Sequence, residues 1–90
     1  MATTNYPWEI GKVYFIRTVT MHLIGKLEGI GDKELVLNPA SWIANSGKFH
    51  TALKEGKLKE VEPFIDGVII NRGSVVDATL WRHDIPMEEK

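Results

Sequence analysis

The 90-residue sequence contains no cysteine, so neither a disulfide bond nor a thiolate zinc site can supplement its hydrophobic core. No apolar run is long enough to cross a bilayer, and residues 1–9 lack the basic stretch and apolar core of a secretory signal. These absences predict a cytoplasmic protein in a reducing compartment, without a membrane partner. A chain of this length buries only about 60–65% of its unfolded surface, which makes oligomerisation the remaining common way to stabilise it.

An excess of positive charge is absent too. The formal net charge is −1, which argues against a protein whose main affinity is for phosphate backbones. The charges are unevenly distributed, since residues 48–59 hold four lysines and one glutamate, whereas residues 60–90 hold seven acids and three bases. Charged runs usually serve solubility, so the simplest interpretation of the lysine-rich segment is a solvent-exposed loop.

Motifs of catalysis and metal binding are missing as well. His22, His50 and His83 lie in separate segments and show no metal-ligand spacing. The serines stand in no nucleophile motif, and Gly29-Ile30-Gly31 lacks the third glycine and the following helix of a phosphate-binding loop. The sequence therefore predicts that the protein is not an enzyme and has no metal site and no cofactor.

The chain does contain a series of short segments rich in β-branched and aromatic residues, which fit the half-buried surface of a sheet. Asn38-Pro39 interrupts the third segment, because proline cannot donate a ladder hydrogen bond, and residues 40–44 can resume it. Gly25 inside the second segment marks a sharp bend or a close approach of two backbones. The five predicted strands cover residues 12–19, 21–30, 34–37, 64–71 and 74–81.

A long insertion, residues 45–60, separates the third strand from the fourth. Its central part, residues 46–56, predicts one short helix. Ser46 can cap the free N–H groups at the start of this helix, and Gly56 suits the left-handed conformation just past its end. A helix this short needs tertiary contacts to persist, so we expect it to pack against the sheet.

The two ends of the chain differ in character. Residues 1–11 form an N-terminal segment in which Pro7 suits the start of a helical turn, whereas residues 84–90 are expected to fray as a flexible tail. We therefore predict a single all-β (mainly β) domain over residues 1–90. Its architecture is a small, strongly bent five-stranded open barrel with one short helical insertion.

Two groups of residues resemble the signature motifs of the Sm family. The second Sm motif is an apolar strand that runs into Arg-Gly and then into a final apolar strand, and residues 69–76, IINRGSVV, resemble it. In the first motif, alternating apolar positions lead to a glycine in the second strand and then to an apolar and a small residue. The matching residues are Val13, Phe15, Leu23, Gly25, Leu27 and Gly29. The motifs span residues 12–37 and 64–81, and the resemblance implies an Sm-like open barrel.

The sequence departs from the family pattern at several positions. Sm proteins that bind RNA usually carry an Asp and an Asn between strands two and three; here Asp32 is present, but Glu34 stands near the place of the Asn. A carboxylate cannot donate the hydrogen bond that an amide gives to a uracil edge. Thr20 replaces a frequent glycine, and Asn71 replaces a usually apolar residue. The chain thus resembles a divergent member, of the kind found in phage.

The resemblance implies a homo-oligomeric ring of about five to seven copies, in which the fourth strand of one copy pairs with the fifth strand of the next. The sequence supports this arrangement, because both strands are apolar and carry little of the charge or proline that blunts an exposed edge. The interface residues predicted on the two edges are Val68, Ile69, Ile70, Val75 and Val76.

The resemblance also implies single-stranded RNA binding at the pore, with Arg72, Gly73 and Asp32 as candidate nucleic-acid-binding residues. Arg72 can stack on a base or pair with a phosphate; its other role is structural, as an arginine that binds loop carbonyls. The tryptophans at positions 8, 42 and 81 fit better as core or interface anchors than as stacking platforms. The alternative function is an oligomeric scaffold that binds no nucleic acid, which the net charge and Glu34 favour.

Overall fold

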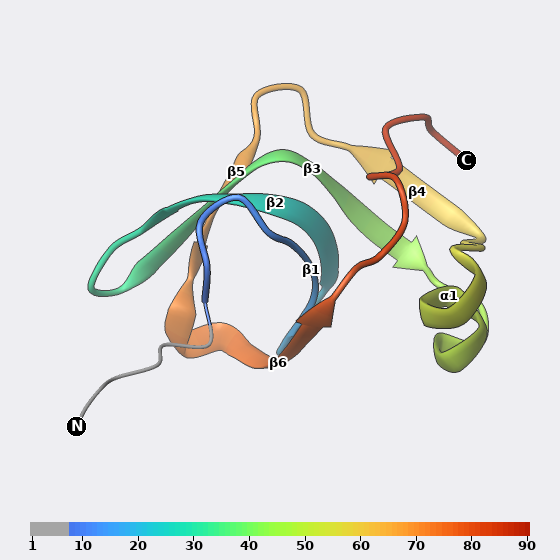
Figure 1. The fold of residues 1–90 in the computed structure, drawn as a ribbon, viewed down its shortest axis with the longest axis horizontal. Helices are drawn as coiled ribbons and strands as arrows, with labels where there is room; N and C mark the ends of the chain where they lie inside the picture. Colours follow the sequence, from blue (N-terminus) through green and yellow to red (C-terminus); the bar gives the residue numbers. More distant parts are fainter. Residues whose placement is uncertain (1–7) are drawn as a thin grey trace.

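The structure, a computed structural model, describes residues 8–90 and shows a strongly curved antiparallel sheet with one short helix (Figure 1). Strands account for 49% of the described residues and helix for 12%, which confirms the all-β class. The predicted helical turn at Pro7 lies outside the described residues. The elements are β1 (Val13–Thr18), β2 (His22–Ile30), β3 (Glu34–Asn45), α1 (Phe49–Glu55), β4 (Glu60–Pro63), β5 (Val68–Asn71), a 3₁₀ turn (Arg72–Ser74) and β6 (Val75–Leu80).

The long strand β3 organises the sheet. Its first part, Glu34–Leu37, pairs with β5, and its second part, Ser41–Asn45, pairs with β4. On its other side β3 pairs with β2, and the order continues through β1 to β6. The sheet curls without closing, and the 3₁₀ turn carries the chain from β5 at one end of the curl to β6 at the other (Figure 1).

The curl depends on a close crossing of β2 and β3 at Gly25. A Cβ atom on Gly25 would lie 2.8 Å from the Cβ of Ala40 and 2.9 Å from the Cβ of Leu37, so a side chain has no room there. This confirms the close approach expected from the sequence. Asn38-Pro39, a cis peptide, lies at a register shift of the β2–β3 pair, where the missing N–H of proline interrupts no ladder bond. The strand therefore runs through the proline instead of ending before it.

Two hydrophobic clusters cover the two faces of β1 and β2. The inner core fills the curl, and the outer core lies under α1 and the C-terminal segment. The inner core consists of Tyr14, Ile16, Leu23, Leu27, Leu35, Leu37, Ala40 and Ile70, and the outer core of Phe15, Ile24, Ile43, Ala52, Leu58, Val61 and Trp81. Burial on both faces explains the apolar runs Val13–Ile16 in β1 and Leu23–Ile24 in β2, whereas the second half of β2 alternates with exposed Lys26 and Glu28.

The five predicted strands do not include β4, which is a sixth strand within residues 8–90. Two glutamates and a proline are typical of a solvated loop, yet Val61 between Glu60 and Glu62 is fully buried in the outer core. A single buried residue between two exposed charges is the shortest form of strand alternation, and four residues show too little of it to be recognised.

The helix begins later than predicted. It starts at Phe49, and within the described residues no side chain caps its first turn. The hydroxyl of Ser46 instead donates to the backbone oxygen of Gly47. Gly56 ends the helix with φ of 75°, which confirms the predicted left-handed terminator.

The segment 84–90 packs against the domain, which differs from the fraying tail that the sequence predicted. The hydroxyl of Ser41 donates to the backbone oxygen of Pro86. Val61 and Lys90 exchange backbone hydrogen bonds of 3.3 and 3.0 Å, so the last residue of the chain extends the sheet beyond β4. Hydrogen bonds to a buried strand, which a charged sequence does not reveal, hold this segment in place.

We expect Gly25→Ala to lower the free energy of unfolding by about 1–3 kcal/mol, because the new methyl group would overlap two core side chains. Gly29→Ala is the matched control on the same strand, since its Cβ would lie 3.6 Å from the side chain of Val36. That change should stay within about 0.5 kcal/mol of the wild type. Urea denaturation followed by circular dichroism measures both, and equal effects would contradict the close crossing.

Candidate functional site

Arg72 connects two turns that are far apart in the sequence. It begins the 3₁₀ turn between β5 and β6 and faces the β2–β3 turn. Its Nη1 donates to the backbone oxygen of Gly31 at 2.7 Å, and its backbone N–H donates to the backbone oxygen of Lys33 at 2.8 Å. The first bond places the guanidinium and the second places the backbone of Arg72 at the end of the curled sheet, beside the β2–β3 turn.

A hollow of about 380 Å³, here called the arginine pocket, lies between these turns. It brings Arg72 and Asp32 together, as the candidate site requires. Gly73, the third candidate, does not line it; the N–H of Gly73 donates to the Oδ1 of Asn71 at 2.8 Å and so belongs to the structure of the turn. The lining residues are Trp8, Ile30, Gly31, Asp32 and Arg72.

Trp8 is the pocket residue that sequence reasoning did not assign to the site. Its ring packs edge-on against Tyr14 with 5.0 Å between centroids. The backbone N–H of Glu9 donates to the hydroxyl of Tyr14 at 2.9 Å, and the N–H of Gly11 donates to the oxygen of Leu27 at 2.8 Å. These contacts hold the segment after residue 7 against the sheet. An aromatic residue near the N-terminus indicates that this segment packs against the domain. The sequence does not reveal that Trp8 packs against Tyr14.

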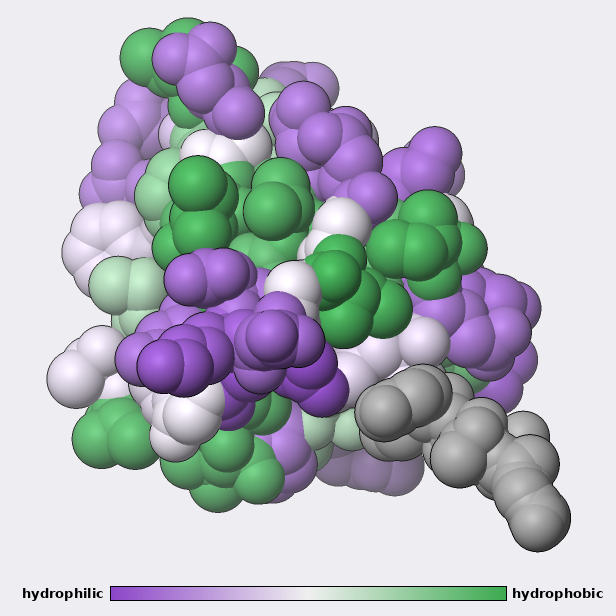
Figure 2. Space-filling view, turned by 90° about the vertical axis from the view of Figure 1, so that its left-hand side faces the viewer, coloured by the Kyte–Doolittle hydropathy of each residue, from purple (hydrophilic) through white to green (hydrophobic). Residues whose placement is uncertain are grey.

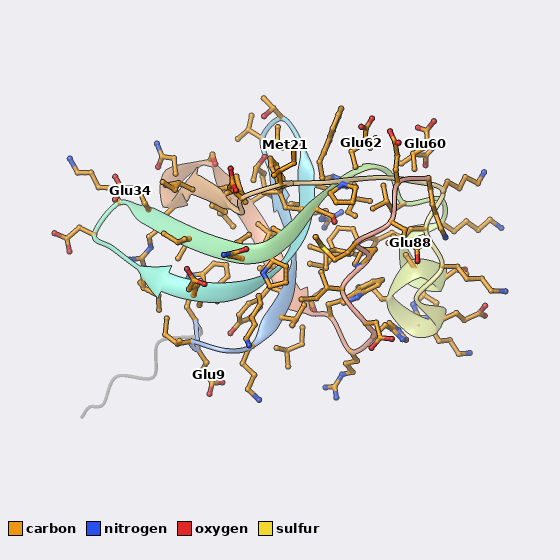
Figure 3. The ribbon with its side chains drawn as sticks, turned by 90° about the horizontal axis from the view of Figure 1, so that it is seen from above. Glu9, Met21, Glu34, Glu60, Glu62 and Glu88 are labelled. Atoms are coloured by element: carbon orange, nitrogen blue, oxygen red, sulfur yellow. The ribbon has the colours of Figure 1, made fainter. Side chains whose placement is uncertain are left out.

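The chemistry of the arginine pocket suits a planar, partly polar ligand. A guanidinium carries five N–H donors, and within residues 8–90 one hydrogen bond, to Gly31, engages its nitrogens. The remaining donors, the face of the guanidinium and the indole of Trp8 can all contact a planar ring. Carboxylates flank the same turn, because Asp32 lines the pocket and Glu34 projects at this end of the molecule (Figure 3). Lys33 in the turn and Arg72 in the pocket balance these two carboxylates, so what the pocket offers beyond charge is stacking on a planar base.

The outer edges of β5 and β6 are unpaired within the described part of the chain. Ile69 on β5 is 71% exposed and Val76 on β6 is 66% exposed, although both are large and apolar. Val68 and Val75 are half-buried against the inner core, and Ile70 lies inside it. Of the five predicted interface residues, Ile69 and Val76 thus have exposed side chains, whereas the other three pack in or against the inner core of the chain itself.

An apolar groove of about 360 Å³ runs beside β6. It shares Trp8 with the arginine pocket, and Tyr14, Val75 and Leu80 supply most of its apolar surface. Figure 2, which faces the β2–β3 turn side of the molecule, shows hydrophobic side chains gathered next to a hydrophilic projection. A free strand edge next to apolar surface is the arrangement to which a further strand can add.

Arg17 and Asp77 tie β6 to the rest of the sheet. The guanidinium of Arg17 donates to both carboxylate oxygens of Asp77, at 2.8 and 2.5 Å, and lies 4.5 Å from the centre of the Phe49 ring. The hydrogen bonds from Arg17 hold the pKa of the Asp77 carboxyl below its usual value of 3.8, and those to Asp77 raise the pKa of Arg17. β6, β1 and α1 therefore meet at one charged contact.

The other residues singled out in the sequence have structural surroundings. Trp81 is buried in the outer core and donates from Nε1 to the oxygen of Asp84, and the ring of His83 contacts Trp81 and the oxygen of Leu53. Trp42 is 39% exposed on the sheet. Within residues 8–90 no three His, Asp or Glu side chains are grouped so as to hold a metal ion. None of the helices in this range has the length and apolar character needed to cross a membrane.

Comparison with known proteins adds no assignment, since no family model matches the chain and no curated protein or solved structure shows significant similarity to it. The candidate site therefore depends on its own geometry.

We expect the Arg17–Asp77 contact to weaken in acid. Because the pKa of Asp77 is lowered in the folded state, its stabilising effect is present above the usual value of 3.8 and is lost as pH falls through the folded pKa. Asp77→Asn should therefore lower the melting temperature at pH 7 and make little difference near pH 2. Melting curves between these pH values measure this, with Asp66→Asn as the exposed control. If the difference in melting temperature between the wild type and Asp77→Asn stayed the same from pH 7 to pH 2, the stabilising role of the Arg17–Asp77 pair would be contradicted.

Proposed function

We propose that this protein is a ring-forming, Sm-like protein that binds single-stranded RNA in the arginine pocket. The observation that carries the proposal is the meeting of Arg72 and Asp32 in one pocket, from segments about forty residues apart, next to the indole of Trp8. This is the pair of turns that the family resemblance relates to RNA. The strand order, with β6 beside β1 and β5 on β3, is also compatible with an Sm-like barrel.

Ring formation is supported by the two strand edges. β5 and β6 are joined by a three-residue turn, yet within the described chain they pair with β3 and β1 and not with each other. Their outer edges therefore point away from the sheet in two different directions. Pairing β5 of one copy with β6 of the next satisfies both edges, and a heterologous contact of this type closes when the rotation per subunit allows. It would also bury Ile69 and Val76.

RNA binding is supported by the position of the pocket relative to these edges. Arg72 lies between β5 and β6, so it is repeated once per subunit beside every interface of the proposed ring. A base held between the guanidinium and the indole of Trp8 would leave its phosphate outside the pocket. Stacking of this type is worth about 1–3 kcal/mol per base and tolerates different sequences.

We expect the wild-type protein to elute as a particle of about five to seven subunits at micromolar concentration. Ile69→Asp and Val76→Asp should convert it into a folded monomer, because each places a charge in an apolar seam. Both side chains are exposed in the single chain, so the subunit itself should remain intact. Size-exclusion chromatography with light scattering measures the mass.

Ile65→Asp provides the matched control for assembly. Ile65 is 98% exposed and lies between β4 and β5, away from the proposed seam. The Ile65→Asp variant should leave the mass of the particle unchanged. A wild-type monomer at micromolar concentration, or equal disruption by Ile65→Asp, would refute the pairing of β5 with β6.

We expect Arg72→Ala to weaken binding of U-rich single-stranded RNA about tenfold, through the loss of one stacked contact per subunit. Arg82→Ala removes the same charge from an exposed position after β6 and should change the affinity little. Filter binding with U-rich and A-rich RNA at two salt concentrations measures this. The particle mass is measured in parallel, because Arg72→Ala must leave the oligomer intact for the loss to report on binding.

The second candidate function is an oligomeric scaffold that binds no nucleic acid. The carboxylate of Asp32 in the pocket lining favours it, together with Glu34 on the same turn, since both would repel a phosphate. In that case Arg72 serves only to bind the Gly31 and Lys33 oxygens across the two turns. An oligomer that dissolves with Arg72→Ala and shows no affinity for either RNA would favour the scaffold.

A further inference from the structure

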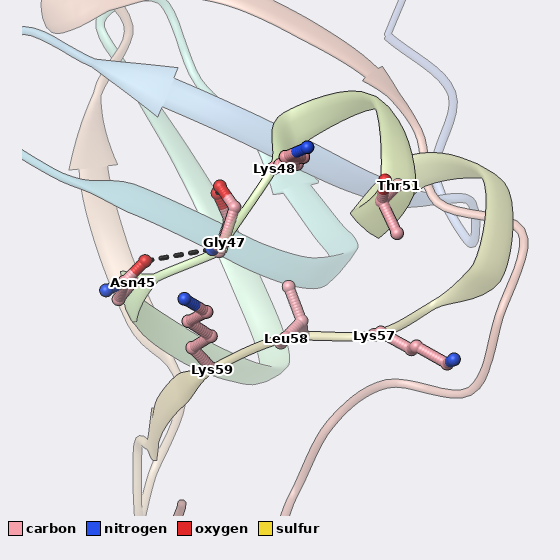
Figure 4. Close-up of a pocket in the computed structure, with 8 residues that line it drawn as sticks. Asn45, Gly47, Lys48, Thr51, Lys57, Leu58 and Lys59 are labelled. Carbon is pink, nitrogen blue, oxygen red and sulfur yellow. Dashed lines mark hydrogen bonds between the residues drawn. The ribbon is translucent and has the colours of Figure 1, made fainter.

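The lysine-rich segment forms a second hollow, at the opposite end of the molecule from the arginine pocket. Its volume is about 550 Å³, and it lies where the end of β3, the start of α1 and the start of β4 meet (Figure 4). We call it the lysine cleft. The residues that line it are Asn45, Ser46, Gly47, Lys48, Thr51, Lys57, Leu58 and Lys59.

The lining is entirely basic or neutral. Three of its side chains are lysines, and none of the lining residues is an acid. Lys57 pairs with Glu55 at 3.3 Å, whereas Lys48 and Lys59 make no ion pair within residues 8–90. A protein with a net charge of −1 therefore gathers uncompensated positive charge at one concave place. The solvent-exposed loop that the sequence predicts for this segment would not require its lysines to gather in one hollow.

The two sides of the lysine cleft are held by backbone contacts. The N–H of Lys59 donates to the oxygen of Asn45 at 3.0 Å, and the N–H of Gly47 donates to the Oδ1 of Asn45 at 2.9 Å. Gly47 has φ of 73°, and a Cβ there would lie 3.4 Å from the stem of Lys59. Leu58 is buried in the outer core and anchors the segment between Lys57 and Lys59. The lysines thus project from a fixed backbone.

We propose that the lysine cleft binds phosphate groups of a nucleic-acid strand, as a site separate from the arginine pocket. Ammonium groups, the hydroxyl of Thr51 and the amide N–H groups of Asn45 are all suited to phosphate oxygens. The two hollows differ in charge, because the arginine pocket has Asp32 beside Arg72 in its lining, whereas the lining of the lysine cleft has three lysines and no acid. That these phosphates belong to a nucleic acid rests on the proposed function, whereas the affinity of the cleft for phosphate does not.

The surroundings favour a strand over an anionic membrane. Glu60, Glu62 and Glu88 lie at the same end of the molecule as the cleft (Figure 3). A flat anionic surface would meet these carboxylates together with the lysines. A single row of phosphates can enter the concave lining and avoid them. The apolar residue in the lining, Leu58, is buried and offers nothing to a lipid chain.

The phosphate chemistry is tested first, with sodium tripolyphosphate in isothermal titration calorimetry at constant ionic strength. We expect Lys48→Ala/Lys59→Ala to weaken binding about tenfold, through the loss of two exposed charge contacts. Lys26→Ala/Lys54→Ala removes two charges from β2 and α1, outside the lining, and is the matched control, which should bind like the wild type. Equal weakening by both variants would overturn the site, because it would reflect net charge alone.

Whether the phosphates come from RNA or from a lipid is tested with a 20-nucleotide single-stranded RNA and with vesicles that contain phosphatidylserine. The double variant should reduce the salt dependence of RNA affinity by about 1.4 in log–log slope, which corresponds to about two phosphates. RNA binding that needs the two lysines and not Arg72 would support the lysine cleft and refute the arginine pocket. RNA binding that needs Arg72 and not the lysines would overturn the present inference and leave the proposed function standing. Binding to vesicles or tripolyphosphate without RNA would overturn it as well.

Discussion

The close crossing of β2 and β3 at Gly25 is the contact on which the rest of the structure depends. Because the backbones approach until a Cβ would touch Ala40 and Leu37, β3 can bend and serve two partners along its length. Its first part carries β5, which leads to Arg72, and its second part carries β4, which leads back from the lysine cleft. The two hollows lie at the two ends of one bent strand, so a single tight contact positions both.

The inner and outer cores explain how such a small sheet supports turns at both of its ends. β1 and the first half of β2 are buried on both faces, so packing alone anchors the centre of a domain that has no cysteine. The side chain of Arg72 joins the 3₁₀ turn to the β2–β3 turn, and the side chains of Asn71 and Asn45 accept backbone bonds from Gly73 and Gly47 within their own turns. These turns can therefore carry charged residues whose positions are fixed by packing that lies elsewhere.

Much of the fold follows from local sequence, and the misses have physical causes. β-branched segments identified five strands, and Gly25 and Gly56 have the conformational roles that glycine predicts. β4 was missed because it shows one buried residue, Val61, and the C-terminal segment because its partners are distant in sequence. At the candidate site, Arg72 and Asp32 could be named from a motif. Trp8 could not, since its place depends on a contact with Tyr14.

The pairing of Lys90 with Val61 has a consequence for the geometry of association. A curled, unclosed sheet has more than two places where another strand can add, and β4 would be one of them. Backbone bonds between Lys90 and Val61 occupy part of that edge. If β5 and β6 pair between copies as proposed, each molecule has two unlike docking edges. Growth from such a unit has a direction and does not branch, so it yields a closed ring or a linear filament and no branched network.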